Sequence, residues 1–279
     1  MGNLFLTVFT PTYNRAHTLR RVYASIKSQI LQKIDGTYLF EWIIVDDGSS
    51  DNTKELIEKW QKEVDFEIIY HFKENQGKPA ASRKGIELAK GEWFLFCDSD
   101  DAFLPETVET FYNIYKNFSQ EEIERCGGIG VLCQDQFGNR VGNDYPIEHK
   151  LLPSMDVVFG WRDKGLGETW ALLKTQNLKK YFVIPNEAKD LKFIPESFFW
   201  SRIVFEAKPY SYFVNKVLRI YYKDEGENIS ENVRKKYPEG FLFESKWFVT
   251  NYWWIIFQYP KIYLRHLIKF IYFSFGIRL

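Results

Sequence analysis

The chain has 279 residues, enough for one large domain or two small ones with a substantial core. It carries 37 basic and 37 acidic side chains, and this balance gives no reason to expect a nucleic-acid partner. Its three cysteines, Cys97, Cys126 and Cys133, are too scattered for a disulfide framework or a zinc site. We therefore expect buried thiols and, because no secretory signal is recognisable, a cytoplasmic location.

Strands and helices are predicted to alternate along the first hundred residues. Four apolar runs indicate buried strands, at 4–9, 41–45, 66–70 and 93–97. Three segments between them carry apolar residues at helical spacing, at 19–30, 56–64 and 79–89. This alternation is typical of right-handed crossovers, so we expect a Rossmann-like, mostly parallel central sheet with flanking helices. Pro11 is not expected inside a central strand, and the chain is predicted to turn there.

The pattern after Pro105 is also mixed. A helix is predicted over 108–115, and another opens at Pro195-Glu196. Three further strands are predicted, at 129–132, 170–174 and 214–222. Glycines between residues 160 and 167 indicate a loop.

Polar residues follow the predicted strands of the first hundred residues at their carboxyl ends. They lie at 10–15 after the first strand, at 46–51 after the second, at 74–79 after the third and at 98–101 after the fourth. Ligands of parallel sheets bind beyond this edge. We therefore expect these four segments to converge on one site.

Asp98, Asp100 and Asp101 place three carboxylates at one strand end. If the strand geometry persists, Asp98 and Asp100 point to the same side. Carboxylates this close repel each other, so a positive group is expected among them. A hard divalent cation such as Mg²⁺ or Mn²⁺ is the natural occupant, because it prefers oxygen ligands and bridges to phosphates. A solvated acidic loop is the alternative.

This ordered set of segments resembles the signature series of family 2 inverting glycosyltransferases with the GT-A fold. The series is Thr10-Pro11-Thr12-Tyr13-Asn14-Arg15, Val45-Asp46-Asp47-Gly48-Ser49-Ser50-Asp51, Asn75-Gln76-Gly77 and Asp98-Ser99-Asp100. A single D-x-D occurs often by chance, whereas four elements in the family's order and spacing are specific. The resemblance covers residues 1–105 and thins beyond them.

The resemblance implies a nucleotide-sugar donor, most often UDP-linked, and a divalent metal, Mn²⁺ or Mg²⁺. Residues 1–105 would bind the donor, 106–222 would form the acceptor-binding half of the same GT-A domain, and 223–279 a C-terminal aromatic and basic helical segment. Carried over by position, the donor-binding residues are Pro11, Thr12, Tyr13, Arg15, Asp46, Asp47, Gly77, Lys78, Arg83, Asp98 and Ser99. Asp100 would bind the metal directly, with Asp98 assisting.

The family also needs a general base for the acceptor hydroxyl. In many members it is an acidic residue that opens a helix in the acceptor half, and Glu196, followed by Arg202, matches that pattern. A carboxylate at a helix N-terminus is also a favourable structural choice, which is the alternative. Glu168 is the second candidate and Asp101 the third. The processive Gln-x-x-Arg-Trp signature is absent from the sequence, which favours transfer of a single sugar.

Residues 241–279 are dense in Trp, Tyr, Phe and Ile. Their longest uncharged run, 247–260, is too short to span a bilayer. After it, Lys261, Arg265 and Lys269 recur every four residues and form a basic stripe on a predicted helix. Such a helix suits the surface of an anionic membrane, so peripheral contact with the inner face of the cell membrane is one prediction. A helix packed on its own domain or in a homodimer is the alternative.

Together these features predict a metal-assisted inverting glycosyltransferase that acts on a glycan or a lipid-linked glycan in bacterial-type surface polysaccharide biosynthesis. A non-catalytic sugar-nucleotide-binding subunit and a sugar-1-phosphate nucleotidyltransferase are the alternatives. The latter would show a Gly-rich, Arg-containing loop after the first strand, where Pro11-Thr12-Tyr13-Asn14 stands instead.

Overall fold

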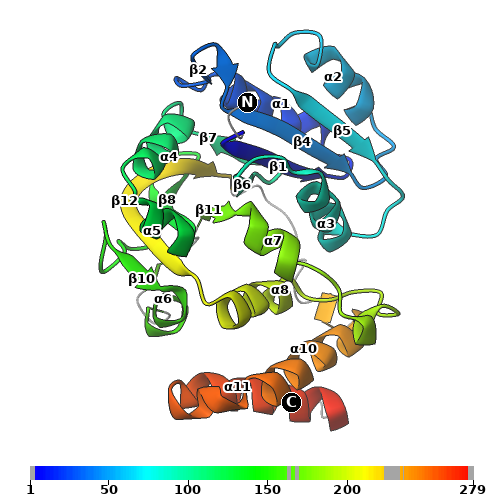
Figure 1. The fold of residues 1–279 in the computed structure, drawn as a ribbon. Coiled ribbons are helices and arrows are strands. Elements are labelled where there is room, and N and C mark those ends of the chain that lie inside the picture. The colour runs from blue at the N-terminus through cyan, green and yellow to red at the C-terminus, as the bar shows by residue number, and fades with distance from the viewer. Residues whose placement is uncertain (1–3, 162–164, 167–169, 223–232, 235, 276–279) are drawn as a thin grey trace. The chain divides into compact units, whose positions relative to one another are not determined.

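The computed structural model describes residues 4–161, 165–166, 170–222, 233–234 and 236–275 (Figure 1). The chain forms two compact units. The first unit comprises residues 1–180 and 208–223, and the second comprises 181–207 and 224–279.

Half of the first unit's sheet is parallel. Its strands are β6 (Trp93–Phe96), β1 (Leu6–Thr12), β4 (Phe40–Asp46) and β5 (Ile68–Phe72), in that order across the sheet. They are linked by α1 (Ala16–Lys27), by α2 (Thr53–Trp60) and by α3 (Lys78–Leu88). The strands lie side by side with the helices packed against them (Figure 1), which confirms the predicted α/β alternation. A short hairpin, β2 (Lys33–Ile34) and β3 (Thr37–Tyr38), precedes β4.

β1 and β4 are buried along their whole length because helices cover both faces of the sheet. Val8 and Trp42 belong to the core formed with α1 and α2. Phe9 points to the other face, where Gly85 of α3 lies against its ring. A Cβ at Gly85 would lie 2.1 Å from that ring, so this close approach of helix and strand requires glycine.

β1 continues through Pro11, so the turn predicted there is wrong. β6 pairs with β1 only as far as Phe9, whereas β4 pairs as far as Thr12. The Thr12 carbonyl accepts a hydrogen bond from Asp47 N at 2.8 Å, so the backbone polar groups of Thr12 face β4. The backbone of Pro11 faces the opposite side, beyond the point where β6 stops pairing with β1. No neighbouring strand needs a backbone N–H from Pro11 there, so proline is tolerated.

Beyond β6 the sheet becomes mixed. β11 (Trp170–Lys174) is antiparallel to both β6 and β8 (Cys126–Asp135), and β12 (Tyr210–Tyr221) runs parallel to β8. These three strands confirm the three predicted after Pro105. The short strands β7 (Ala102–Phe103), β9 (Arg140–Val141) and β10 (Leu151–Pro153) pair at the margin. The remaining helices of this unit are α4 (Thr107–Lys116), α5 (Gln120–Arg125), α6 (Ser154–Gly160) and α7 (Thr175–Tyr181), whose last residue belongs to the second unit.

The second unit is helical in its described part. It contains a 3₁₀ turn (Asn186–Ala188), α8 (Glu196–Arg202), a π-helical turn (Ile203–Ala207), α10 (Pro238–Asn251), the 3₁₀ segment η4 (Trp253–Phe257) and α11 (Pro260–Phe275). Proline opens both α10 and α11, where its missing N–H costs nothing. Aromatic pairs hold the helices together, including Phe198 with Trp247 and Phe205 with Tyr252. None of the helices in the described ranges combines the length and the apolar character that crossing a bilayer requires.

Candidate functional site

The loops that follow β1 and β4 are joined by hydrogen bonds. Asn14 N donates to Ser49 Oγ at 2.8 Å, and Asn14 Oδ1 accepts from Ser50 N at 2.8 Å. Asn14 has a φ of 52°, in the left-handed region that asparagine tolerates better than most residues. The first two polar segments therefore meet at the carboxyl edge of the parallel strands, as predicted.

Asp47 holds the third loop in place and is 4% exposed. Its Oδ1 accepts hydrogen bonds from Gln76 N at 3.0 Å and Lys73 Nζ at 2.6 Å, and its Oδ2 accepts from Gly77 N at 2.7 Å. Gly77 has a φ of 86° and leads directly into Lys78 and α3. Asp47 thus fixes this backbone, while Oδ2 keeps the capacity for one more hydrogen bond.

Asp46 is 1% exposed and shapes the turn after β4. Its Oδ1 accepts from Ser49 N and its Oδ2 from the Tyr70 hydroxyl, both at 2.8 Å. Burial and the Asp46 carboxylate raise the pKa of Tyr70, so the phenol keeps its proton and donates it. Gly48 has a φ of 90°, and a Cβ there would lie 3.0 Å from Asn75 N. This turn therefore requires both the buried carboxylate and the glycine.

The carboxylates after β6 lie on a turn. β6 ends at Phe96, and Asp101 N donates to the Asp98 carbonyl at 3.2 Å. The strand geometry assumed for Asp98 and Asp100 is therefore not formed. Lys78 Nζ lies 2.8 Å from Asp98 Oδ1, so the third loop and the acidic turn are also in contact.

Arg219 of β12 lies among these carboxylates and is 4% exposed. Its Nε donates to Asp101 Oδ2 at 2.9 Å, and its Nη2 contacts both that oxygen and Asp98 Oδ2, the latter at 3.4 Å. Burial alone would lower the pKa of Arg219, but Asp101 and Asp98 raise it, so the guanidinium stays charged. The positive charge expected beside the aspartates thus comes from Lys78 and Arg219 in this structure. The sequence did not predict a role for Arg219. The only sequence feature that could have indicated it is the cluster of aspartates, which requires a positive group nearby.

The comparisons with known proteins identify this region. Residues 7–119 match the family model described as glycosyl transferase family 2. These residues form a family 2 glycosyltransferase domain. The poly(ribitol-phosphate) beta-N-acetylglucosaminyltransferase TarP of Staphylococcus aureus is 33% identical over 129 residues, which are 45% of this chain and 37% of TarP. A poly(ribitol-phosphate) beta-glucosyltransferase of Bacillus spizizenii is 31% identical over 126 residues, 44% of this chain and 19% of that enzyme. The match thus spans well under half the length of these relatives.

Solved glycosyltransferases share the fold of this chain. TarS 1–349 of S. aureus, in complex with UDP-GlcNAc, superposes with a TM-score of 0.62 at 19% identity, over 88% of this chain and 66% of that one. The mannosyltransferase PcManGT of Pyrobaculum calidifontis, in complex with GDP-Man and Mn²⁺, superposes with a TM-score of 0.58 at 16% identity. The superposition covers 88% of this chain and 64% of that one. At these identities the likeness shows the fold, and it confirms the predicted GT-A class.

The predicted donor-binding residues of the glycosyltransferase domain differ in exposure. Tyr13 is 50% exposed at the end of β1, and Arg15 and Ser99 are partly exposed. Thr12 is 3% exposed, and its hydroxyl makes no hydrogen bond with any other described residue. Arg83 lies partly buried on α3, and this burial lowers its pKa. These side chains leave hydrogen-bonding and stacking capacity at the edge where the four loops meet.

The acidic turn fits a metal held mainly by phosphate oxygens. Within the described ranges, no three or more His, Cys, Asp or Glu side chains are grouped to hold an ion. However, Mg²⁺ often takes only one or two protein carboxylates besides phosphates and water. Asp100 is partly exposed and makes no hydrogen bond or ion pair within the described part of the chain, whereas Lys78 and Arg219 engage Asp98. The carboxylate of Asp100 is therefore available to a ligand, two residues after Asp98.

The three predicted bases lie in different settings. Glu196 is the first residue of α8 in the second unit and is partly exposed, with Pro195 as the N-cap, so the predicted helix start is confirmed. Glu168 lies outside the described residues. Asp101 is 1% exposed, and its oxygens accept from Arg219 and from Tyr222 N. These contacts make Asp101 a structural carboxylate and weaken its candidacy as a base.

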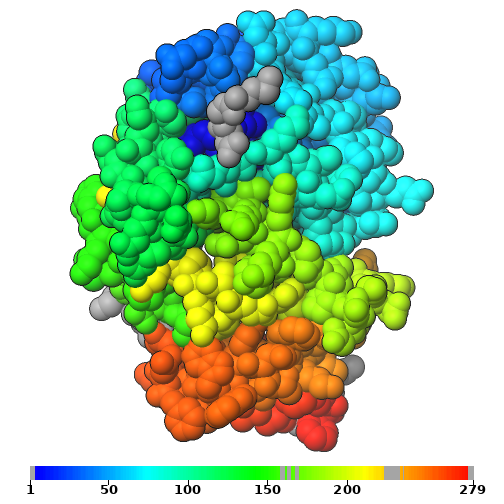
Figure 2. All heavy atoms as spheres, in the orientation of Figure 1, coloured from blue at the N-terminus to red at the C-terminus, as the bar shows by residue number. Residues whose placement is uncertain are grey.

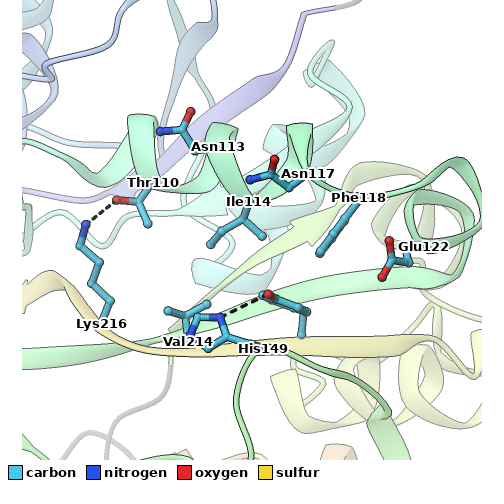
Figure 3. Close-up of a pocket in the computed structure, with 10 residues that line it drawn as sticks. Thr110, Asn113, Ile114, Asn117, Phe118, Glu122, His149, Val214 and Lys216 are labelled. Atoms are coloured by element: carbon cyan, nitrogen blue, oxygen red, sulfur yellow. Dashed lines mark hydrogen bonds between the residues drawn. The ribbon is translucent and has the colours of Figure 1, made fainter.

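A pocket of about 470 Å³ lies on the mixed half of the first unit (Figure 3). It is lined by Thr110, Asn113, Ile114, Asn117, Phe118, Glu122, His149, Tyr212, Val214 and Lys216. Ile114, Phe118 and Val214 supply apolar surface, and the amide, carboxylate, imidazole and ammonium groups supply polar surface around it. None of the predicted donor-binding residues lines this pocket.

Proposed function

We propose that this protein is an inverting glycosyltransferase. It moves one sugar from a nucleoside-diphosphate sugar to a hydroxyl of a glycan or a lipid-linked glycan. The observation that carries the proposal is the meeting of four polar loops at one edge of the parallel strands in a family 2 domain. That edge is where open α/β sheets bind nucleotides.

In the proposed reaction, the acceptor hydroxyl gives its proton to Glu196 while its oxygen attacks the anomeric carbon. The bond from that carbon to the diphosphate oxygen breaks on the opposite face, so the configuration inverts. A divalent cation, when bound, stabilises the charge that develops on the leaving diphosphate. Asp100 is the proposed ligand of this ion, assisted by Asp98. Tyr13 would stack on the base, and Lys78 would neutralise a phosphate oxygen.

The donor and the cellular setting are proposed from the relatives. We propose a UDP-sugar, because TarS was solved with UDP-GlcNAc, although PcManGT takes GDP-Man on the same fold. TarP and the Bacillus enzyme act on poly(ribitol-phosphate), which supports a role in bacterial surface polysaccharide biosynthesis. We place the protein in the cytoplasm, in peripheral contact with the inner face of the membrane through residues 241–279.

We propose that the pocket between α4 and β12 binds a sugar unit of the acceptor, within the acceptor-binding half expected at 106–222. An apolar floor with amide and charged groups at its rim suits a sugar ring, which has apolar faces and a polar circumference. Replacing both Asn113 and Asn117 with alanine is expected to raise the acceptor KM about 2- to 10-fold for each hydrogen bond lost. Donor affinity should not change. Lys116→Ala on the same helix is the control, and an unchanged acceptor KM in the double variant would refute this role.

Asp100→Asn is expected to lower metal-stimulated donor turnover by about 10²-fold or more, because the amide is a poor ligand for a hard cation. Turnover is measured with Mn²⁺, with Mg²⁺ and after chelation. Asp65→Asn is the control, because Asp65 is an exposed carboxylate in the loop between α2 and β5, outside the four predicted polar segments. Equal metal stimulation in Asp100→Asn and the wild type would sink the assignment of Asp100.

A panel of nucleotide sugars separates the proposed enzyme from its alternatives. The purified protein is incubated with metal and each donor, and the products are read by mass spectrometry. Release of nucleoside diphosphate and free or transferred sugar supports a glycosyltransferase. Binding without turnover indicates a partner subunit. Formation of a nucleoside triphosphate and a sugar 1-phosphate, when pyrophosphate is added to the incubation, indicates a nucleotidyltransferase; either outcome contradicts the proposal.

A further inference from the structure

The outer face of α11 in the second unit is apolar and exposed. Leu264, Ile268, Ile271 and Phe275 are 48%, 59%, 42% and 75% exposed. Their spacing of four, three and four residues places them on one stripe of the helix. A stripe of large apolar side chains facing water is unfavourable in a free protein, so it indicates a surface that something covers.

This stripe is not the face that holds the second unit together. Ile262, on the other side of α11, is 7% exposed. His266 stacks on Phe248 with ring centroids 3.7 Å apart, and Phe273 stacks on Phe241 at 5.7 Å. The helix therefore packs against α10 through its inner side and presents a second apolar side outward.

The segment η4 adds exposed aromatic side chains beside this helix in sequence. Trp253 is 58% exposed and Phe257 is 79% exposed. In Figure 2 the atoms of this C-terminal region, coloured orange to red, lie at the surface. We call the lipid face the stripe of α11 made of Leu264, Ile268, Ile271 and Phe275.

Two exposed cations of α11 lie close to the lipid face in sequence, and a third basic residue, Lys269, interacts with the buried Glu244 of α10. Lys261 and Arg265 are exposed, and Lys269 is partly exposed one turn further on. No Asp or Glu follows Glu244 in the chain. Trp, Lys and Arg around an apolar stripe are the composition of a helix that lies in a membrane interface.

We propose that the lipid face inserts into the headgroup region of a bilayer that contains anionic phospholipids. The apolar stripe supplies the insertion, and Lys261 and Arg265 contact the phosphates. Charge complementarity decides for anionic lipid over a second copy of this chain, because a second copy would bring the same cations to the contact. This docking rests on the peripheral membrane contact of the proposed function and names the side chains that make it, and it does not depend on the proposed sugar transfer.

Sedimentation of the full chain with vesicles tests the proposal. We expect at least tenfold tighter binding to vesicles of phosphatidylglycerol and phosphatidylcholine than to phosphatidylcholine alone. Leu264→Ser with Ile268→Ser should weaken binding at least tenfold to both. Lys261→Gln with Arg265→Gln should remove the preference for anionic vesicles and its salt dependence. Ile30→Ser, at a residue of the first unit that is 64% exposed, is the matched control and should bind as the wild type does.

Circular dichroism and donor hydrolysis distinguish a loss of membrane binding from a loss of folding or of activity. Circular dichroism and donor hydrolysis should be unchanged in all variants, so a failure of the proposed chemistry leaves this test intact. Absence of vesicle binding by the wild type, or equal binding by Leu264→Ser with Ile268→Ser, would overturn the proposal. So would a wild-type dimer in light scattering that this double variant dissociates, because the face would then belong to a second copy.

Discussion

Replacing Glu196 with glutamine is expected to lower the rate of sugar transfer by about 10²- to 10⁴-fold, the usual contribution of a general base. Glutamine keeps the size of the side chain and its place at the start of α8, but it cannot take the acceptor proton. Because the donor is bound by other groups, the donor Kd from calorimetry should stay the same. The loss should therefore appear in kcat.

The competing explanation is that Glu196 only stabilises the start of α8 through the helix dipole. That role is worth about 0.3–1 kcal/mol and would lower the melting temperature slightly without changing the rate. Glu239→Gln is the matched control, because Glu239 occupies the first turn of α10 in the same unit and is exposed. The pH profile adds a readout specific to catalysis, since only loss of a base removes the acid limb of kcat.

The series of variants can also assign the base elsewhere. If Glu168→Gln abolishes transfer while Glu196→Gln retains it, Glu168 is the base and the resemblance at Pro195-Glu196-Ser197 is fortuitous. If both variants transfer normally, the proposed inverting mechanism with an acidic base in this part of the chain is wrong. Donor hydrolysis, measured alongside, shows whether the donor site itself is intact.

The parallel half of the fold could be predicted because its signals are local. Apolar runs such as Trp42-Ile43-Ile44-Val45 read as strands buried on both faces, and β4 is buried at every position. The edge where loops converge followed from the topology of parallel sheets, not from any single residue. The contacts of Asp47 with Gln76 and Gly77 then confirm that the second and third loops meet.

Other features depend on contacts between distant parts of the chain and left no local signal. The extension of β1 through Pro11 depends on where the neighbouring strand β6 stops. The turn at Asp98 to Asp101 replaces the strand geometry assumed there, because side chains from other elements hold it. The partner of Asp101 comes from β12, 118 residues further on, and an isolated arginine in a strand-like run is usually assigned to the surface.

Arg219→Met is expected to destabilise the first unit by about 3–5 kcal/mol, the cost of breaking a buried ion pair by removing one partner. Asp101 would be left 1% exposed without its main charged neighbour. Urea unfolding measures the loss. Lys54→Met is the control, because Lys54 pairs with Glu58 on the surface of the same unit, and no measurable change is expected there. Wild-type stability in Arg219→Met would refute the structural importance of this pair.

A second substitution separates the effect of Arg219 on the stability of the first unit from its effect on the position of Asp98 and Asp100. Arg219→Met combined with Asp101→Leu removes both charges, and such apolar replacement of a buried pair is often neutral or stabilising. Stability should therefore return. Donor turnover should not, because Arg219 also contacts Asp98 and the turn that carries Asp100 would lose its anchor. Arg219→Lys should retain part of both properties, since lysine keeps the charge but not the planar fork. Full turnover in the stable double variant would show that the ion pair serves folding alone, and that Asp98 and Asp100 hold their places without it.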